Sequence, residues 1–557
     1  MAESPGALLG KASRAGADEA FSDLVHQFQD PLAFLRELVQ NALDAGSTLI
    51  ELRFTHGGEG LVQVEVEDNG EGMDEATIDR YLLTLFRSTK EEDLTKIGKF
   101  GIGFVSIFAF EPELAVCETG RAGESWRLIF HPGGRFEKLR LAEPLEGTRV
   151  RLLKRMRPED FERLREQGRR VVAYWCKYAE CEIRVDGEPI NEPFQLDAPF
   201  ARRYTEPGTE FWLGLARPGP RSGDAGDPLD GFEARVSFSN RGLTLLEAGR
   251  VPGPHEDLAG ICLVAKSRYL EHTLTRDNVL QDEQFDKLVD LVRKELDASV
   301  LPRLFEHMRR WAAHRSGAVR APAPGEPALE PCLRMARLPC VRFASQAERE
   351  PVFPTTDGEP LSLRRLRRQT VLAARRSNPV TRLLAERGQD VLLRLPGLSD
   401  LLRQCAGIEI RSADATYCTA VPSAGSLKPE EAQALCQRVA GLASRAGLRV
   451  DGVHLGRLDY PSSKVAKRLF IRQREAFGLT ETGVDDRPTI FGGARQLVLN
   501  AQHGLARRCL ELARDDLELA ALLVAQAVVL TESDAGSAAA DLPARSFAQR
   551  SCEERGP

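Results

Sequence analysis

Three short segments near the start of the chain, in a set order, constrain its fold more than any other feature. Residues 34–45 place Leu35 and Leu38 at helical spacing, which predicts a helix with one apolar face against a core. Residues 61–73 then predict a strand that ends in an acidic, glycine-containing turn. A glycine-rich loop at residues 98–103 follows, so that all three pieces lie within about seventy residues.

The first piece presents polar groups suited to a metal and a water. Glu37 and Asn41 are four residues apart, so they lie one above the other on the predicted helix, and Asp44 follows one turn later. A carboxylate can take a proton from an attacking water. A neutral amide oxygen is a hard ligand that Mg²⁺ accepts. We therefore expect Glu37 to act as a base, Asn41 as the metal ligand and Asp44 as a neighbour in the same site.

The second piece carries groups that suit a flat, amine-bearing ring. Asp68 follows the alternating segment 61–66, where a short carboxylate can accept a hydrogen bond from an exocyclic amine such as that of adenine. Gly70 and Gly72 allow the backbone to approach such a ring closely. Met73 supplies a soft apolar wall.

The third piece predicts a phosphate-binding loop. Glycines precede the apolar run 104–108, which predicts a helix, and backbone N–H groups at such a helix start point toward an anion. Alone, each piece has a plainer explanation as a solvated helix face, a turn or a loop; their order and spacing favour one nucleotide site. The expected phosphate contacts are Gly98, Lys99, Phe100, Gly101, Ile102, Gly103 and Phe104.

These motifs resemble the ATP-binding (GHKL, or Bergerat) domain shared by gyrase-type topoisomerases, heat-shock protein 90 chaperones, histidine kinases and MutL-type repair proteins. The resemblance implies a mixed sheet with helices on one side and ATP·Mg²⁺ between them. A further family element, Gly-Thr before a strand, is matched by Gly147 and Thr148. Adenine would then rest on Asp68, the metal on Asn41, and Glu37 would activate water.

The chaperone branch resembles this chain most closely. The glycine loop at residues 98–106 is similar to the chaperone loop and lacks the Arg-Gly-Glu-Ala run of MutL-type proteins. Histidine kinases carry this domain at the C-terminus, whereas here it begins near residue 20. Residues 81–96 resemble the mobile lid of the family, in which Lys90 would contact phosphates together with Ser88 and Thr89.

A distant arginine adds to this resemblance. Residues 274–281 precede an amphipathic helix, and Arg276 resembles the middle-domain arginine that reaches the ATP γ-phosphate in the HSP90 family. Such a cation stabilises charge that develops during phosphoryl transfer. The family places a glutamine four residues after the arginine, whereas Gln281 lies five after Arg276, and its role stays open.

Composition excludes several classes of protein. The 557 residues are too many for one core and predict three or four domains. The net charge of −6 argues against a general nucleic-acid binder. Eleven cysteines without a Cys-x-x-Cys pair favour a reduced, cytoplasmic protein. From the N-terminal residues we expect no signal peptide, and the most apolar stretch, 519–530, is too short for a membrane span.

The expected architecture is a multidomain α+β or α/β protein. The predicted parts are an ATP-binding α/β sandwich (1–187), a ribosomal S5-like α/β middle domain with the arginine loop (188–318), a linker (319–330), a small α/β segment (331–427), a mainly helical dimerisation domain (428–533) and a disordered tail (534–557).

The resemblance implies an ATP-dependent, HSP90-like (HtpG-like) molecular chaperone. It would hydrolyse ATP to drive clamp closure on unfolded or partly folded client proteins, and would form a homodimer through its C-terminal helices. Two alternatives stay open: a DNA-linked ATPase of the MutL or topoisomerase kind, and a divergent ATPase switch in microbial defence or signalling.

Overall fold

The structure is a computed structural model that describes residues 30–83, 103–132, 135–220, 227, 229–273, 278–316, 328–482 and 496–532. It divides into two compact units, Met1–Val300 and Leu301–Pro557.

The first unit opens with a mixed sheet, which has eight strands in the described residues and the order β5-β4-β3-β6-β2-β1-β7-β8. The pair β1 and β7 is parallel, and every other neighbouring pair is antiparallel. The strands are β1 (Leu49–His56), β2 (Leu61–Asp68), β3 (Leu114–Arg121), β4 (Glu124–Phe130), β5 (Phe136–Arg140), β6 (Gly147–Arg155), β7 (Glu182–Val185) and β8 (Glu188–Pro189).

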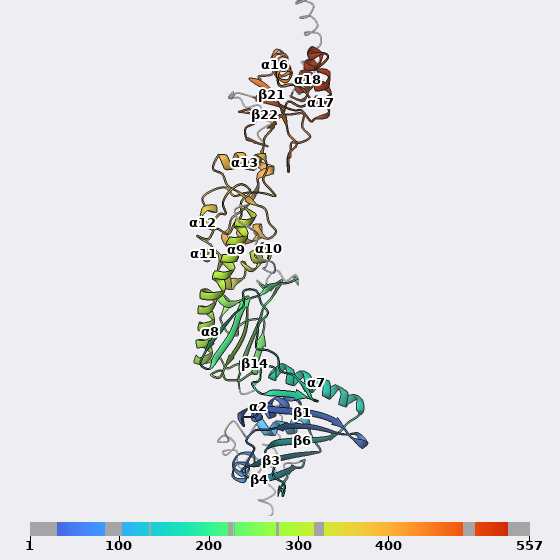
Figure 1. The fold of residues 1–557 in the computed structure, drawn as a ribbon, viewed down its shortest axis with the longest axis vertical. Helices are drawn as coiled ribbons and strands as arrows, with labels where there is room; N and C mark the ends of the chain where they lie inside the picture. The colour runs from blue at the N-terminus through green and yellow to red at the C-terminus, as the bar shows by residue number, and fades with distance from the viewer. Residues whose placement is uncertain are drawn as a thin grey trace, which may run out of the picture. The chain divides into compact units, whose positions relative to one another are not determined.

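Two helices, α2 (Ala33–Asp44) and α7 (Pro158–Cys176), cover one face of this sheet (Figure 1). The α2 helix buries Leu35 and Leu38 against it, as the helical spacing predicts, and it also buries Phe34. Along β2, alternate residues are buried because successive side chains point to opposite faces of a strand. A mixed sheet with helices on one side is what the resemblance implies.

Short helical segments connect these elements. They are η1 (Gly58–Gly60), α3 (Glu75–Thr77), the π-helix η2 (Ile78–Leu82) and the 3-10 helix η3 (Ser106–Phe110). Asp74 caps α3, because its carboxylate accepts a hydrogen bond from the Thr77 N–H. The predicted helix after the glycine loop is present, with its second half in the tighter 3-10 form.

A second sheet follows in the same unit, with the order β14-β13-β15-β10-β9. Its strands are β9 (Arg202–Glu206), β10 (Thr209–Leu215), β13 (Arg235–Asn240), β14 (Leu243–Ala248) and β15 (Ile261–Ser267), and a small ladder joins β11 (Arg217–Pro218) to β12 (Phe232–Glu233). After η4 (Glu256–Leu258), the predicted amphipathic helix is α8 (Glu283–Glu295), which continues into η5 (Leu296–Val300). It buries Phe285, Leu288 and Val292, and Asp282 caps its N-terminus.

The second unit begins with helices and a small parallel sheet, β17-β16-β18. The helices are α9 (Leu301–Arg315), α10 (Leu329–Met335), η6 (Pro339–Val341), α11 (Phe343–Gln346), α12 (Leu363–Leu366), α13 (Pro379–Glu386), α14 (Leu398–Ala406) and α15 (Ala413–Thr416). The strands are β16 (Leu372–Ala374), β17 (Val391–Leu393) and β18 (Arg411–Ser412).

The last part of the second unit is mostly helical and also contains a mixed sheet, β20-β21-β24-β22. The helices α16 (Pro429–Arg445), α17 (Gly504–Leu512) and α18 (Leu517–Glu532) gather beside it (Figure 1). The strands are β20 (Val421–Pro422), β21 (Gly452–Arg457), β22 (Phe470–Gln473) and β24 (Gln496–Asn500), and β19 (Tyr417–Cys418) pairs with β23 (Thr480–Glu481). The sequence predicts the helices here but not this sheet.

The apolar stretch at residues 519–530 lies in α18. This helix buries Ala520, Val524 and Val528, while Leu519 and Leu523 stay exposed. Within the described part of the chain, no helix combines the length and the apolar character that a membrane crossing requires.

Candidate nucleotide-binding site

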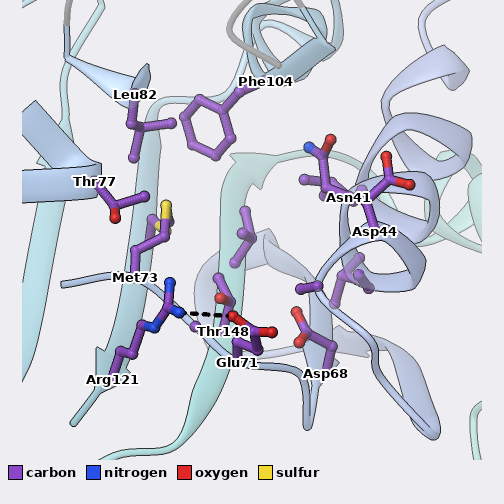
Figure 2. A pocket seen from close by; sticks show the side chains of 17 residues that line it. Asn41, Asp44, Asp68, Glu71, Met73, Thr77, Leu82, Phe104, Arg121 and Thr148 are labelled. Atoms are coloured by element: carbon purple, nitrogen blue, oxygen red, sulfur yellow. Dashed lines mark ion pairs between the residues drawn. The ribbon is translucent and has the colours of Figure 1, made fainter. Parts of the chain in front are cut away.

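A cavity of about 390 Å³ lies between α2 and the eight-stranded sheet. This volume is in the range of small-molecule sites. Figure 2 shows Asn41 and Asp44 on one side of it and Thr77, Leu82 and Phe104 on the other. The predicted residues that the structure brings together here are Asn41, Asp44, Asp68, Gly72, Met73, Phe104 and Thr148.

Asp68 is a partly buried acid in the wall of this cavity. Its Oδ1 accepts hydrogen bonds from the Ser47 Oγ at 3.0 Å and from the Gly70 N–H at 2.8 Å. Burial raises the pKa of the Asp68 carboxyl, and these hydrogen bonds only partly offset that effect. A buried carboxylate gains from any further donor, so a ligand amine placed in the cavity would be favoured here.

Gly72 of the acidic turn and Gly147 at the start of β6 must be glycine for a structural reason beyond the approach of a ring. Gly72 has φ +64°, and a Cβ there would lie 2.1 Å from the carbonyl oxygen of Gly120. Gly147 has φ +83°, and its Cβ would lie 2.1 Å from the carbonyl oxygen of Asp68. Both positions accept only glycine, because two backbone segments meet there without space for a side chain.

A chain of hydroxyl groups joins this turn to β3 and β6. The Met73 N–H donates to the Thr119 Oγ1 at 2.9 Å, and the Thr119 and Thr148 hydroxyl oxygens are 3.0 Å apart. Thr148 is also the cross-strand neighbour of Asp68 in the pairing of β2 with β6. The predicted Gly-Thr element therefore lies beside the predicted acid, eighty positions later in the sequence.

The polar residues of α2 divide between the cavity wall and the interior. Asn41 and Asp44 line the cavity, whereas Glu37, one turn earlier, is 2% exposed and is not among the lining residues. Burial raises the pKa of the Asp44 carboxyl, an effect that an ion pair with Arg241 at 3.1 Å partly offsets. Asn41 and Asp44 together offer the oxygen donors that Mg²⁺ accepts.

Residues 32–129 match the family described as histidine kinase-, DNA gyrase B-, and HSP90-like ATPase. The chain carries an ATPase domain of this type. Such a domain implies the binding of ATP and Mg²⁺ and the hydrolysis of ATP. The matched segment contains the α2 residues, the acidic turn and the glycine loop, so it covers most of the predicted site.

The relatives of this chain include both repair proteins and chaperones. The DNA mismatch repair protein MutL of Opitutus terrae is 34% identical over 129 residues, which are 22% of this chain and 19% of that protein. The chaperone protein HtpG of Chlorobium luteolum is 28% identical over 256 residues, 39% of each. The MutL of Thermosipho melanesiensis is 26% identical over 233 residues, 36% of this chain and 39% of that protein.

The chain thus spans about a fifth to two fifths of the length of these curated relatives. The HSP90 branch that the sequence motifs favour is not singled out by these similarities, because MutL proteins match the same domain.

Several predicted residues of the site lie outside the described residues. These are Ser88, Thr89, Lys90, Gly98, Lys99, Phe100, Gly101 and Ile102 of the ATPase domain, and the distant Arg276. Of the loop, Gly103 and Phe104 are described; Phe104 is buried, lines the cavity and packs against Phe130. Gln281, whose role the sequence leaves open, is exposed.

Sequence reasoning missed an ion pair in the wall of the cavity. Arg121, at the end of β3, pairs with Glu71 of the acidic turn at 2.8 Å, and both line the cavity (Figure 2). It also missed Cys117, a buried wall residue whose thiol pKa is raised to about 12, mainly by burial and also by Asp68 and Glu118. The alternation of residues along β3 points Cys117 inward, but nothing local indicates which sheet face holds a ligand.

The side chains that could hold a metal ion in this cavity come from α2. Among the described residues, no group of three or more His, Cys, Asp or Glu side chains is arranged to hold a metal ion. Mg²⁺ usually takes one or two protein oxygens together with waters and substrate phosphates. Asn41 and Asp44 fit that description.

Proposed function

We propose that the chain is an ATP-driven molecular clamp of the HSP90 chaperone type. The observation that carries the proposal is the cavity in which Asn41, Asp44 and Asp68 converge, with the buried Glu37 one helical turn before Asn41 on α2. In this proposal Asp68 accepts the adenine amine, and Asn41 would hold Mg²⁺, which would supply charge neutralisation at the phosphates. Glu37 takes a proton from the water that attacks the γ-phosphate, so that ADP and inorganic phosphate leave.

The charge pattern of the ATPase domain supports a protein client over a nucleic acid. In the described residues, arginines on the outer face of the eight-stranded sheet pair with glutamates. Examples are Arg53 with Glu65 and Glu67, Arg149 with Glu67, and Arg127 and Arg151 with Glu118. Paired in this way, the arginines are not available to neutralise phosphates along a strand of DNA. The net charge of −6 for the whole chain agrees with this.

Glu37 supplies the test of hydrolysis. Glu37→Ala should keep ATP binding and lose on the order of 10²-fold or more in turnover, the usual scale for a positioned base. Glu37→Gln preserves the shape of this buried side chain and should behave alike. Glu51→Gln on the outer sheet face is the matched control and should leave turnover unchanged. Phosphate release measures turnover, and calorimetry with a non-hydrolysable ATP analogue measures binding; an unaltered rate in both Glu37 variants would refute the assignment.

A DNA-linked clamp is the second candidate, because MutL proteins recur among the relatives. The two candidates differ in what the clamp holds. For a chaperone we expect suppression of aggregation of an unfolding protein, unaffected by DNA competitor, and an ATPase rate that DNA does not change. Stimulation of turnover by DNA, with no effect on aggregation, would favour the repair-like clamp.

We also propose that two copies associate through α18. Leu519, Leu523 and Leu530 follow one stripe of this helix and are exposed by 43%, 38% and 51%. Packing against a second copy would remove this apolar stripe from water. The double variant Leu519→Asp, Leu523→Asp should be monomeric by light scattering, whereas Leu139→Asp, at an exposed leucine of β5, should match the wild type. A double variant with the mass of a dimer would exclude this interface.

A further inference from the structure

The hairpin of β13 and β14 in the second sheet lies directly on the ATPase domain. Its tip is a two-residue turn, Arg241 and Gly242, between the paired residues Asn240 and Leu243. Both turn residues have positive φ, +46° and +85°, as the type I′ turn requires. A Cβ on Gly242 would lie 1.9 Å from the carbonyl oxygen of Tyr178, so the turn contacts the chain just after α7.

Two further contacts hold the hairpin in place. Leu243 is buried in the same apolar cluster as the core of the ATPase domain. Glu247 forms an ion pair with Lys177 at 2.8 Å, and the side chains are only 15% and 8% exposed. Burial opposes ionisation of Glu247, but hydrogen bonds from Lys177 and Arg235 outweigh it and lower the pKa of the Glu247 carboxyl. The hairpin is therefore anchored on both its apolar and its charged side.

From this anchored tip, Arg241 reaches the nucleotide cavity without lining it. Its Nη1 donates a hydrogen bond to the Asp44 Oδ1 at 3.1 Å. Asp44 is the last residue of α2 and belongs to the cavity wall, on the same helix as Glu37 and Asn41. A residue of the second sheet thus holds a side chain of the site.

We infer that Arg241 is a positioning residue for the nucleotide site: it orients the Asp44 carboxylate and couples nucleotide binding to the docking of the β13–β14 hairpin. The inference rests on the proposed nucleotide function of the cavity. Coupling between two sites is reciprocal, so a nucleotide that contacts Asp44 must also change how firmly the hairpin is held.

A double-mutant cycle on the full chain tests the coupling. ADP and a non-hydrolysable ATP analogue are titrated by calorimetry into the wild type, Arg241→Ala, Asp44→Asn and the double variant. Arg241→Ala should weaken binding about twofold to fivefold, the scale of a partly exposed ion pair. The double variant should bind no more weakly than Asp44→Asn alone, and Arg241→Lys should recover most of the loss.

The chain offers a closely matched control in Arg250→Ala. Arg250 pairs with Asp227 at 3.1 Å, with exposed fractions of 61% and 33%. The pair of Arg241 with Asp44 has the same distance and exposed fractions of 61% and 30%. Neither Arg250 nor Asp227 lines the cavity, so Arg250→Ala should leave nucleotide binding unchanged.

Hydrogen exchange of residues 235–248 separates coupling from a merely structural role. Nucleotide should change the protection of this hairpin in the wild type and in Arg250→Ala, and should leave it unchanged in Arg241→Ala and Asp44→Asn. Two results would overturn the inference and leave the proposed function intact. One is an Arg241→Ala variant with the same nucleotide affinity and hairpin protection as Arg250→Ala. The other is a double variant in which the losses of affinity from the two single variants add. A wild-type chain that binds no nucleotide overturns both.

Discussion

The two faces of the eight-stranded sheet differ in how their carboxylates are stabilised, and the neighbours Glu67 and Asp68 of β2 show the contrast. On the outer face, burial opposes ionisation of Glu67, but hydrogen bonds from Arg149 and Arg53 outweigh it and lower the pKa of its carboxyl. On the inner face, burial raises the pKa of the Asp68 carboxyl in spite of its hydrogen bonds.

The difference indicates which face is built for a ligand. On the outer face, charges are satisfied by neighbours on adjacent strands, so the surface is complete by itself. On the inner face, a carboxylate is kept in a cavity where its charge is costly, an arrangement typical of functional sites. Adjacent positions along one strand can therefore serve stability and binding separately, because successive side chains point to opposite faces.

Gly72→Ala should give the largest effect on the inner face. The Cβ would lie 2.1 Å from the Gly120 carbonyl oxygen at a positive φ, so the turn must shift, and we expect a loss of about 2–4 kcal/mol in the free energy of unfolding with loss of nucleotide binding. Gly123→Ala is the control, since its φ is also positive and nothing lies within 4 Å. If urea unfolding gives equal losses of stability for both variants, the positive φ alone, and not the close contact at the cavity, accounts for the loss.

Asp68→Asn should weaken nucleotide binding by about 10- to 100-fold, from the loss of a charge-assisted hydrogen bond. The unliganded protein should be as stable as the wild type or more stable at neutral pH. The carboxyl pKa is raised above its ordinary 3.8 in the folded state, so the cost of the charge is present above the folded pKa and absent below pH 3.8. Calorimetric titration measures the nucleotide affinity, and urea unfolding at several pH values measures the stability. An unchanged affinity would count against the whole site.

Glu67→Gln should have the smallest effect of the three variants. It should lower the stability of the unliganded protein, whereas Asp68→Asn should leave it unchanged or raise it. Its folded pKa lies below the ordinary 4.5, so the stabilisation by Arg53 and Arg149 is fully present above pH 4.5 and is lost as the pH falls through the folded value. We expect a loss of about 1 kcal/mol at neutral pH, the scale of partly exposed ion pairs, and no change in nucleotide affinity. A change in affinity equal to that of Asp68→Asn would remove the distinction between the two faces.

Much of the site can be predicted from local sequence, because its residues follow the periods of the elements that carry them. Asn41 and Asp44 share one face of a helix, and Asp68 and Met73 follow a strand with clear alternation. The buried Glu37 shows the limit of this reasoning: spacing places it near Asn41 but does not determine which of the two side chains borders the cavity.

The missed residues depend on contacts between distant segments. Arg121 meets Glu71 from a strand fifty positions away, and Arg241 meets Asp44 across almost two hundred. No period links such positions, since strand order and the docking of a hairpin are decided by packing. The sheet around β21 and β24 is missed for the same reason, because its strands are short and far apart in the sequence.

The sequence by itself determined the helix, the acidic turn and the order of the motifs that identify an ATPase domain, because these depend on short-range spacing and residue chemistry. The tertiary structure alone decided that Gly72 and Gly147 must lack side chains, that Asp68 lies beside Thr148, and that Arg241 holds Asp44. The physical reason is that burial and close backbone contact arise only when segments remote in the chain pack together, and those contacts set both the available space and the charge of the site.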